Sequence, residues 1–571
     1  MSSTASAKKK NARPWEAALG DISADMPPVS EESIAETVEK HVQEAPDAPC
    51  VEYLGISLTY GELDQWANRF ANMLRDLGAE RGDVIGLHLP NTPQYLIGLL
   101  AASKLGCAAS GVSPLLKPDE LAYQVQNAGI RFLVSLDQLF VEAGVPNDGK
   151  LPELKAAIVA SPIDFLPGWK KKLAVWLGKV PKIKLPELKQ IKVVDYWPAI
   201  NAASDARVLE HVDMDDVVLI QYTGGTTGKP KGAELTLRNV LSNAAQSEAL
   251  VNYEVGKDTF ASVFPYFHAA GLGVALMSLR QRARVIVVPD PRDVKSFSRA
   301  MQQFPPTLIG NVPTLFQMLL EEPEFAKVDF SQLKIAMSGA APAPVELIKQ
   351  VEKYVGKGKY CEAYGLTETS PMLTTNPPGR AKPGTVGVPI PGTDIRIVDA
   401  ETGDKEMPFN EPGELIANGP QVFRGYLGLP EESKKALRKF DGKTFFYTGD
   451  IAMMDEEGYI TICDRAKDML IVGGYKVFSV EVENKLKELQ EVELSAVIGK
   501  PDAKRPGNDI VTLYVEPSEA GRRQSEDAVK QTVLAFCKEH MAAYKVPKEI
   551  HIVDEIPLTP VGKIDKKALR G

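Results

Sequence analysis

A single loop constrains this chain more than any other segment. It comprises residues 222–232, reads Tyr-Thr-Gly-Gly-Thr-Thr-Gly-Lys-Pro-Lys-Gly, and directly follows an apolar, strand-like run at residues 217–220. Glycines let backbone N–H groups approach a ligand closely, while the threonine hydroxyls and lysines add donors and positive charge. The loop therefore predicts a cradle for phosphate groups. It is not a Walker A loop, because Thr223 and Pro230 stand where that motif has its first glycine and its final Ser or Thr.

The sequence around this loop is typical of an α/β protein. Helical patterns such as residues 62–77 alternate with short apolar runs such as residues 84–89, and the alternation returns at residues 217–288 and 333–398. Beyond residue 441 the pattern changes. Short β-like runs are predicted there at residues 458–463, 469–472, 496–498, 509–515 and 549–553, with helices at residues 479–489 and 526–540.

These patterns predict two folded units. The charged, loop-like segment 464–467 is the expected junction between them. The predicted organisation is a disordered tail at residues 1–14, a large domain at residues 15–463, a hinge at residues 464–467 and a small α+β domain at residues 468–571.

Composition excludes several classes of protein. Lys and Arg number 66 against 75 Asp and Glu, and the net charge of −9 argues against a general nucleic-acid binder. The apolar stretch 95–112 is interrupted by Lys104 and falls short of a membrane-spanning helix. Residues 1–13 lack the apolar segment of a signal peptide, and the five cysteines are scattered without pairs. These features predict a cytoplasmic protein without a disulfide framework.

Residues 165–192 form a basic segment with eight lysines and one acidic residue, Glu187. At helical spacing, one face of this segment is apolar and consists of Trp169, Leu173, Trp176, Leu177 and Val180. Two interpretations stay open: the apolar stripe packs on the protein core, or it lies in the interface of an anionic membrane.

Seven motifs follow one another along the chain. They lie at residues 222–232, 265–271 (Pro-Tyr-Phe-His-Ala-Ala-Gly), 338–342 (Ser-Gly-Ala-Ala-Pro), 364–371 (Tyr-Gly-Leu-Thr-Glu-Thr-Ser-Pro), 447–450 (Tyr-Thr-Gly-Asp), 464–468 (Asp-Arg-Ala-Lys-Asp) and 557–563 (Pro-Leu-Thr-Pro-Val-Gly-Lys). In this order they resemble the AMP-forming acyl-CoA synthetases of the adenylate-forming superfamily. The resemblance implies a large N-terminal α/β domain with stacked sheets and a β-barrel subdomain, and a small mobile α+β C-terminal domain.

The resemblance also implies a reaction and its small molecules: ATP, Mg²⁺ and coenzyme A. A carboxylate attacks the α-phosphorus of ATP to give acyl-AMP and pyrophosphate, and the thiol of coenzyme A then attacks the activated carbonyl. Donors and cations must be placed around the phosphates in advance. The implied phosphate-binding residues are Thr223, Gly225, Thr226, Thr227, Gly228 and Lys231. Glu368 is the implied Mg²⁺ ligand, and Thr367 the donor to the α-phosphate.

Further site residues follow from the same motifs. The implied adenine-binding residues are Gly339, Ala340, Ala341 and Tyr364, and the ribose hydroxyls are assigned to Asp450 and Arg465. Lys563 resembles the lysine that bridges the carboxylate and the α-phosphate, and His268 borders the acyl pocket. Lys467 is the implied pivot of the small domain, and Gly474 the glycine beside the pantetheine arm of coenzyme A.

The identity of the acid depends on weaker signals. The apolar, small-residue stretch 268–277 leaves room for an alkyl chain, Gly224 resembles the bacterial long-chain subgroup, and segment 165–192 resembles the basic insertion of long-chain enzymes that take substrate from the membrane. These signals favour a long-chain fatty acid and peripheral contact with the inner face of the membrane. The alternative is a medium-chain or cyclic or aromatic acid–CoA ligase. A luciferase-like oxygenase and a catalytically silent sensor share the fold, and family members are often homodimers.

Overall fold

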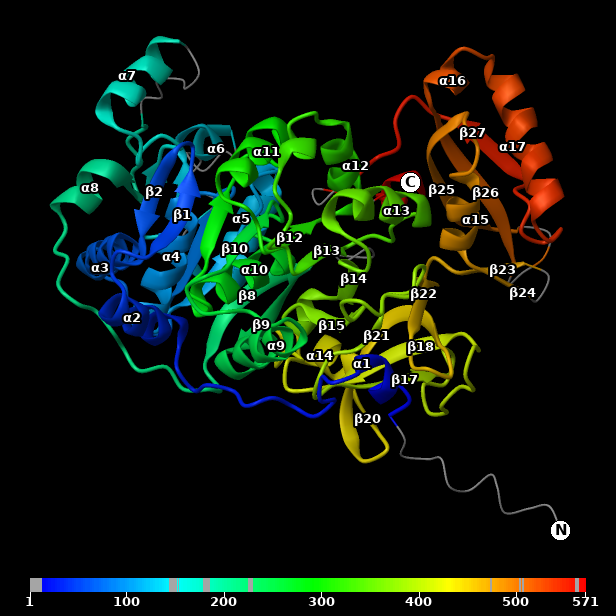
Figure 1. Ribbon diagram of the computed structural model, residues 1–571, viewed down its shortest axis with the longest axis horizontal. Helices are drawn as coiled ribbons and strands as arrows, with labels where there is room; N and C mark the ends of the chain where they lie inside the picture. Colours follow the sequence, from blue (N-terminus) through cyan, green and yellow to red (C-terminus); the bar gives the residue numbers. More distant parts are fainter. Residues whose placement is uncertain are drawn as a thin grey trace.

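The computed structural model describes residues 13–142, 151, 153–177, 185–223, 229–472, 475–502, 505, 508–559 and 564–570. Its larger part is built on two wide sheets (Figure 1). The first has eight strands, in spatial order β19 (Gly425–Tyr426), β9 (Lys231–Thr236), β8 (Val217–Thr223), β4 (Ala108–Gly111), β3 (Val84–His88), β5 (Ile130–Leu136), β6 (Ala156–Ala160) and β7 (Lys192–Asp195). From β8 to β7 neighbouring strands are parallel, and central strands such as β6 are buried along their whole length, as their continuous apolar runs predict.

The second sheet has nine strands and carries much of the predicted site. Its spatial order is β16 (Val388–Pro389), β15 (Met372–Thr375), β14 (Tyr360–Gly365), β13 (Ile335–Gly339), β12 (Leu308–Asn311), β10 (Thr259–Ser262), β11 (Arg284–Val287), β1 (Pro49–Tyr53) and β2 (Ile56–Thr59). Strands β14 to β1 of this order are parallel. The carboxyl ends of such strands are where ligands bind in open α/β sheets.

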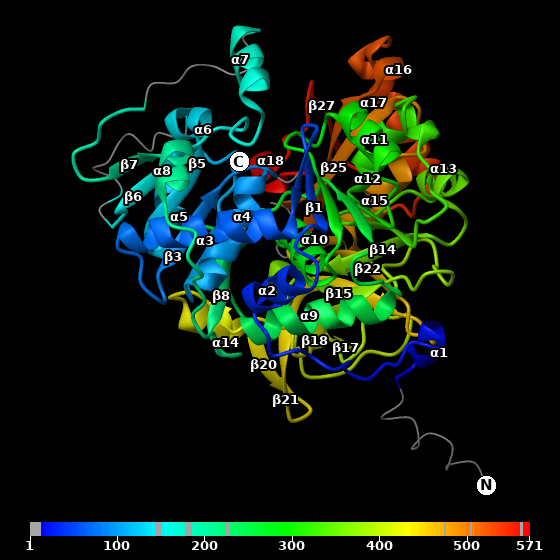
Figure 2. The same ribbon diagram turned by 60° about the vertical axis from the view of Figure 1, so that its left-hand side comes forward.

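Helices fill the space between the two sheets (Figure 2). They are α2 (Ile34–Glu44), α3 (Tyr60–Asp76), α4 (Pro93–Lys104), α9 (Leu237–Leu250) and α10 (Ala269–Arg280). The helix predicted at residues 62–77 is α3, which starts at a capping box formed by Thr59 and Glu62. Helices α4 and α10 are apolar on nearly every face because they are buried, and one apolar cluster runs through both sheets.

The remaining helices of the large domain lie around these layers. They are α1 (Glu16–Leu19), α5 (Pro118–Ala128), α6 (Asp137–Glu142), α7 (Gly168–Trp176), α8 (Tyr196–Ala202), α11 (Val294–Gln303), α12 (Pro313–Glu321), α13 (Val345–Val355), α14 (Pro430–Ala436) and the short 3₁₀ turns η2 (Phe325–Lys327) and η3 (Thr367–Thr369). Within the described ranges, no helix has the length and apolar character that a bilayer crossing requires.

A third, antiparallel sheet corresponds to the part predicted as a β-barrel. It consists of β17 (Asp394–Val398), β18 (Gly413–Asn418), β20 (Leu437–Phe440), β21 (Lys443–Met454) and β22 (Ile460–Arg465). Strand β21 pairs with β18, β20 and β22, so it forms the centre of this sheet. Strand β22 is also the last strand before the C-terminal domain.

The C-terminal domain forms a separate lobe, at the right of Figure 1. Its elements are β23 (Leu470–Val472), β24 (Tyr475–Val477), α15 (Ser479–Leu486), β25 (Val492–Pro501), β26 (Asp509–Pro517), α16 (Glu519–Arg522), α17 (Glu526–His540), β27 (Glu549–Ile552) and α18 (Lys566–Arg570). Both helices predicted from the sequence are present as α15 and α17, and four of the predicted strands correspond to β23, β25, β26 and β27, with ends shifted by a few residues. The strand predicted at residues 458–463 is β22 of the third sheet, and β24 was not predicted. The domain has its own apolar core, in which α15 and α17 pack on the sheet β25–β26–β27.

The basic segment forms helix α7, which projects from the large domain in both views (Figures 1 and 2). None of its residues is buried, and Trp169 and Trp176 are 65% and 80% exposed. The interpretation in which the apolar stripe packs on the core is therefore wrong. Val180, the last residue of the predicted stripe, lies outside the described residues.

Candidate active site

Four strands bring the predicted nucleotide-binding residues together. Strands β13 and β14 are parallel neighbours, so the loop after Gly339 and the segment after Gly365 leave the same edge of the sheet. Strands β21 and β22 are antiparallel, and their register places Asp450 opposite Arg465. The predicted adenine and ribose residues therefore come from two sheets that meet at this edge.

Asp450 is the centre of this cluster. Its Oδ2 accepts a hydrogen bond of 2.6 Å from the hydroxyl of Tyr364, and its Oδ1 lies 2.7 Å from Nε of Arg465. The carboxylate is buried, so these two contacts act in a weakly screened environment. Burial, and then the charge of Asp450, raise the pKa of the Tyr364 phenol well above its usual value. The three residues form one rigid unit that keeps the phenol protonated.

The adenine loop has an unusual backbone conformation. Ala340 has a φ of 69°, in the left-handed region that residues with a Cβ rarely adopt. Beneath the loop, Oε1 of Glu362 accepts a 3.0 Å hydrogen bond from the backbone N–H of Ala343. Burial raises the pKa of Glu362 from 4.5 to about 7. Ala340 and Ala341 are exposed, so their backbone is open to a ligand.

Glu368 lies in η3, which packs against β8 and β9, the two strands that flank the phosphate loop. Its side chain is buried, and its Oε1 accepts a 2.8 Å hydrogen bond from the hydroxyl of Tyr426. Burial raises the pKa of this carboxyl group, while the Tyr426 hydrogen bond opposes the shift. Thr367, the adjacent predicted residue, is also buried. A buried carboxylate beside a phosphate loop is a suitable oxygen ligand for a magnesium ion.

The phosphate loop is described only at its two ends. Thr223, at the end of β8, pairs with Lys231, at the start of β9. The Nζ of Lys231 lies 2.7 Å from Oε2 of Glu432 and 5.0 Å from the ring centre of Tyr426. Hydrogen bonds from Lys231 and Lys435 lower the pKa of Glu432 to about 2. Gly225, Thr226, Thr227 and Gly228 lie outside the described residues.

His268 stands at the start of α10, where its Nδ1 accepts a 3.3 Å hydrogen bond from the backbone N–H of Ala270. Next to it is a small, mostly apolar space of about 10 Å³. Its lining residues are Leu219, Gln221, Leu235, Val240, Ala269, Leu272, Gly273, Leu276 and Ser370. Part of the predicted small-residue stretch thus lines an apolar space between α9 and α10, beside the 364–371 motif.

The predicted pivot sits at the domain junction. Lys467 lies two residues after the end of β22, and its side chain is exposed. Asp468, its neighbour, lies 2.5 Å from the guanidinium of Arg570 in α18, and Lys566 in the same helix lies 2.7 Å from Glu483. These contacts hold α18 against the junction. Lys563 and Gly474 lie outside the described residues.

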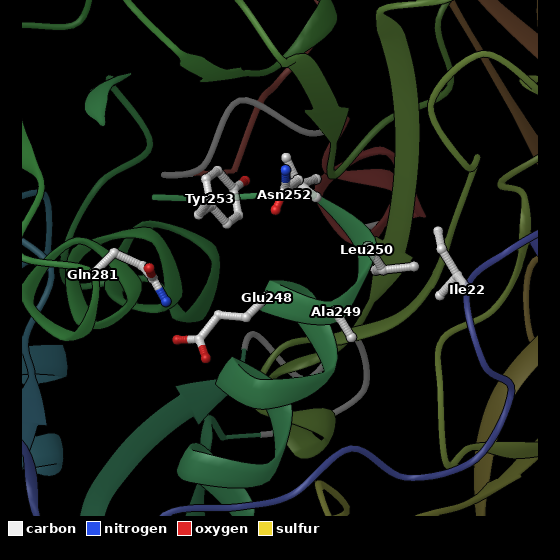
Figure 3. A pocket seen from close by; sticks show the side chains of 8 residues that line it. Ile22, Glu248, Ala249, Leu250, Asn252, Tyr253 and Gln281 are labelled. Atoms are coloured by element: carbon white, nitrogen blue, oxygen red, sulfur yellow. The ribbon is translucent and has the colours of Figure 1, made fainter. Parts of the chain in front are cut away.

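A much larger cavity lies elsewhere and contains none of the predicted site residues (Figure 3). It measures about 460 Å³ and is lined by Ile22, Glu248, Ala249, Leu250, Val251, Asn252, Tyr253 and Gln281. The carboxylate of Glu248 is already engaged by Arg280 at 2.9 Å.

Three residues of the site were not predicted from the sequence: Glu362, Tyr426 and Glu432. Glu362 precedes the 364–371 motif by two positions, and a charged residue inside an apolar strand pattern could have marked it. No local signal marks Tyr426 or Glu432, which lie about 200 residues from Lys231 in sequence and reach it through the pairing of β19 with β9.

The chain is similar to known proteins over nearly its whole length. Residues 38–427 match the family model described as AMP-binding enzyme, and residues 481–563 match that of the AMP-binding enzyme C-terminal domain. A Bacillus subtilis (strain 168) protein named long-chain-fatty-acid–CoA ligase is 32% identical, over 98% of this chain and 97% of the relative. A feruloyl-CoA synthase from Amycolatopsis sp is 32% identical, over 92% and 96%. The crystal structure of the anthranilate CoA ligase AuaEII in complex with anthranoyl-AMP has a TM-score of 0.81 at 24% identity, covering 95% of this chain and 97% of that one.

The fold and the family match over most of the chain define an adenylate-forming ligase. The chain belongs to the AMP-binding enzyme family. The predicted family, the predicted fold and the predicted class of AMP-forming acyl-CoA ligase are thereby confirmed.

Proposed function

We propose that this protein activates a long-chain fatty acid with ATP and transfers the acyl group to coenzyme A, giving acyl-CoA, AMP and pyrophosphate. The observation that carries the proposal is the convergence of the Tyr364–Asp450–Arg465 unit, Glu368 and Lys231 at one edge of the strands. Full-length similarity to a relative named long-chain-fatty-acid–CoA ligase supports the choice of acid.

In the first half-reaction a carboxylate oxygen of the acid bonds to the α-phosphorus and pyrophosphate leaves. Tyr364 offers its ring to the adenine, and Asp450 and Arg465 take the ribose hydroxyls. Lys231, Thr223 and the loop 224–228 neutralise the leaving phosphates, and Thr367 donates to the α-phosphate. Because Tyr364, Asp450 and Arg465 hold one another before substrate binds, little reorganisation of these three residues is needed as charge develops.

Glu368 is the residue that would hold Mg²⁺ together with phosphate oxygens. The fit rests on its buried carboxylate, which Tyr426 orients and which lies beside the phosphate loop. When bound, the ion would neutralise phosphate charge and favour departure of pyrophosphate.

The second half-reaction is assigned to a rearranged C-terminal domain. Lys467 is the pivot of the hinge at residues 464–467, Gly474 borders the pantetheine arm, and Lys563 serves only the first half-reaction. Lys563→Ala should therefore lower acyl-AMP formation by ~10²- to 10³-fold and retain most transfer from supplied acyl-AMP to coenzyme A. Gly474→Leu should do the reverse. Equal loss of both half-reactions in Lys563→Ala contradicts this division.

Helix α7 gives the enzyme a surface for lipid. Its exposed stripe of Trp169, Leu173, Trp176 and Leu177 is flanked by lysines, which suits an interface that contains anionic headgroups. Peripheral binding to the inner face of the membrane would place the enzyme beside its water-insoluble substrate.

A second candidate function is ligation of a medium-chain, cyclic or aromatic acid. One observation favours it: the 32% identity with a feruloyl-CoA synthase. Pyrophosphate release with ATP, Mg²⁺ and coenzyme A decides between the two. We expect a maximum at twelve carbons or more in a series from butyrate to oleate, whereas a maximum on benzoate, cyclohexanecarboxylate or a short acid selects the alternative.

A further inference from the structure

Tyr426 touches two functional groups that come from different parts of the sequence. Its hydroxyl donates to Oε1 of Glu368 at 2.8 Å, and its ring lies under the ammonium of Lys231, 5.0 Å away. The ammonium is in turn 2.7 Å from Glu432. Tyr426 therefore connects Lys231, the predicted phosphate-binding lysine, to the carboxylate of Glu368.

Several neighbours fix the position of Tyr426. Strand β19 pairs with β9, with Tyr426 opposite Ala233, and the backbone N–H of Tyr426 donates to the hydroxyl of Ser433 at 2.8 Å. Its ring packs edge-on against Phe423 at 4.8 Å between ring centres. The backbone N–H of Phe423 donates to the carbonyl oxygen of Glu368 at 2.9 Å. The same short segment thus holds both the backbone and the side chain of Glu368.

We propose that Tyr426 is a positioning residue that orients the Glu368 carboxylate for the metal and couples it to Lys231, so that the metal and phosphate subsites are occupied together. The inference rests on the proposed role of Glu368 as the Mg²⁺ ligand. A hydrogen-bond partner that fixes a ligating carboxylate typically contributes about 10- to 100-fold in metal affinity or activity. The hydroxyl holds Oε1, and Oε2 lies outside this hydrogen bond.

The test compares variants of the full-length protein in two measurements. The first is the Mg²⁺ concentration that gives half-maximal pyrophosphate release. The second is calorimetric binding of ATP at several Mg²⁺ concentrations without fatty acid or coenzyme A, so that no turnover occurs. Tyr459→Phe is the matched control, because this buried tyrosine donates to the carbonyl of Arg380 at 2.6 Å, away from the site.

Tyr426→Phe keeps the ring under Lys231 and removes only the hydroxyl. It should raise the Mg²⁺ midpoint about 10-fold or more in both measurements, with kcat at saturating Mg²⁺ close to that of the unaltered enzyme. Tyr426→Leu also removes the ring, so it should in addition raise KM for ATP at saturating Mg²⁺. Glu368→Gln distinguishes the positioning role of Tyr426 from the role of Glu368 as the Mg²⁺ ligand. If it shifts the midpoint and Tyr426→Phe behaves like Tyr459→Phe, the positioning role is wrong; if Glu368→Gln itself leaves the midpoint unchanged, the metal role of Glu368 fails and the inference fails with it.

Discussion

The nucleotide site and helix α7 differ in which side chains they bury. Around Asp450 and Glu368, polar groups are buried and hydrogen-bonded to one another before any substrate binds. On α7, large apolar groups lie in water, while a cation, Lys171, is turned inward onto the ring of Trp197 at 3.9 Å. Burying a charge without a partner costs free energy, and so does exposing an indole to water. The first region is therefore preorganised by the protein, whereas the protein leaves the apolar stripe of α7 exposed.

We expect the largest effect from a substitution in the preorganised nucleotide site. Asp450→Asn keeps the shape and removes the charge that holds Tyr364 and Arg465. Because two hydrogen bonds to a charged group are weakened together, kcat/KM for ATP should fall by ~10²- to 10³-fold in a pyrophosphate-release assay. Asp394→Asn is the matched control, since Asp394 pairs with Arg396 at 2.8 Å in the same sheet. A similar loss in the control would assign the effect to the sheet and not to the site.

Glu362 is the exception within the paired site, because its Oε2 has no hydrogen-bond partner among the described residues. Its folded-state pKa of about 7 lies above the 4.5 of an exposed glutamate. The folded state therefore binds the proton more tightly, and stability falls as the pH rises from about 4.5 to 7. Glu362→Gln can still accept from Ala343. It should become more stable than the unaltered protein by ~3 kcal/mol above pH 7, and by little below pH 4.5.

Unfolding of both proteins from pH 4 to 8 measures this difference. A gap in unfolding free energy that stays constant across the pH range would contradict the titration of Glu362.

The next prediction concerns the two exposed indoles of α7, Trp169 and Trp176. Trp169→Ser with Trp176→Ser should weaken binding to vesicles of anionic phospholipid by ~30-fold, or ~2 kcal/mol, because less apolar surface leaves water on binding. Co-sedimentation with vesicles measures the effect. Phe409→Ser controls for loss of an exposed aromatic residue elsewhere, since Phe409 is 48% exposed. Unchanged vesicle binding by the double variant removes the lipid role of α7, and ligation of a short, water-soluble acid should be unaffected.

The smallest effect is expected at Lys171, whose contact with Trp197 holds α7 in its outward position. Lys171 rests on Trp197, which belongs to an aromatic cluster with Trp66 and Phe165 at ring distances of 5.4 to 5.7 Å. Lys171→Gln should cost ~0.5–1 kcal/mol and speed chymotrypsin cleavage within α7 by ~2- to 5-fold. Lys172→Gln, on the exposed side, should leave the cleavage rate unchanged. Equal acceleration by both variants would show that Lys171 is no anchor.

Much of the fold could be predicted from the sequence because local patterns dominate it. Helix α17 spans the predicted residues 526–540, and α3 and β3 lie within a few residues of the predicted segments. Within the site, Tyr364, Asp450, Arg465, Glu368, Lys231 and Thr223 were each identified from a motif, since each motif is contiguous. Tyr426 and Glu432 were not, because their role arises only from strand pairing across about 200 residues.

The class of chemistry follows from the order of motifs in the sequence. The order of glycines, hydroxyls, carboxylates and lysines along the chain is enough to indicate phosphate binding and adenylate formation, because short-range backbone geometry sets what each motif can contact. Which groups are paired and which are left exposed depends instead on the tertiary structure. The apolar stripe of α7 fits a core or a membrane equally well as a pattern, and burial in three dimensions, which depends on every other element, turned it toward solvent.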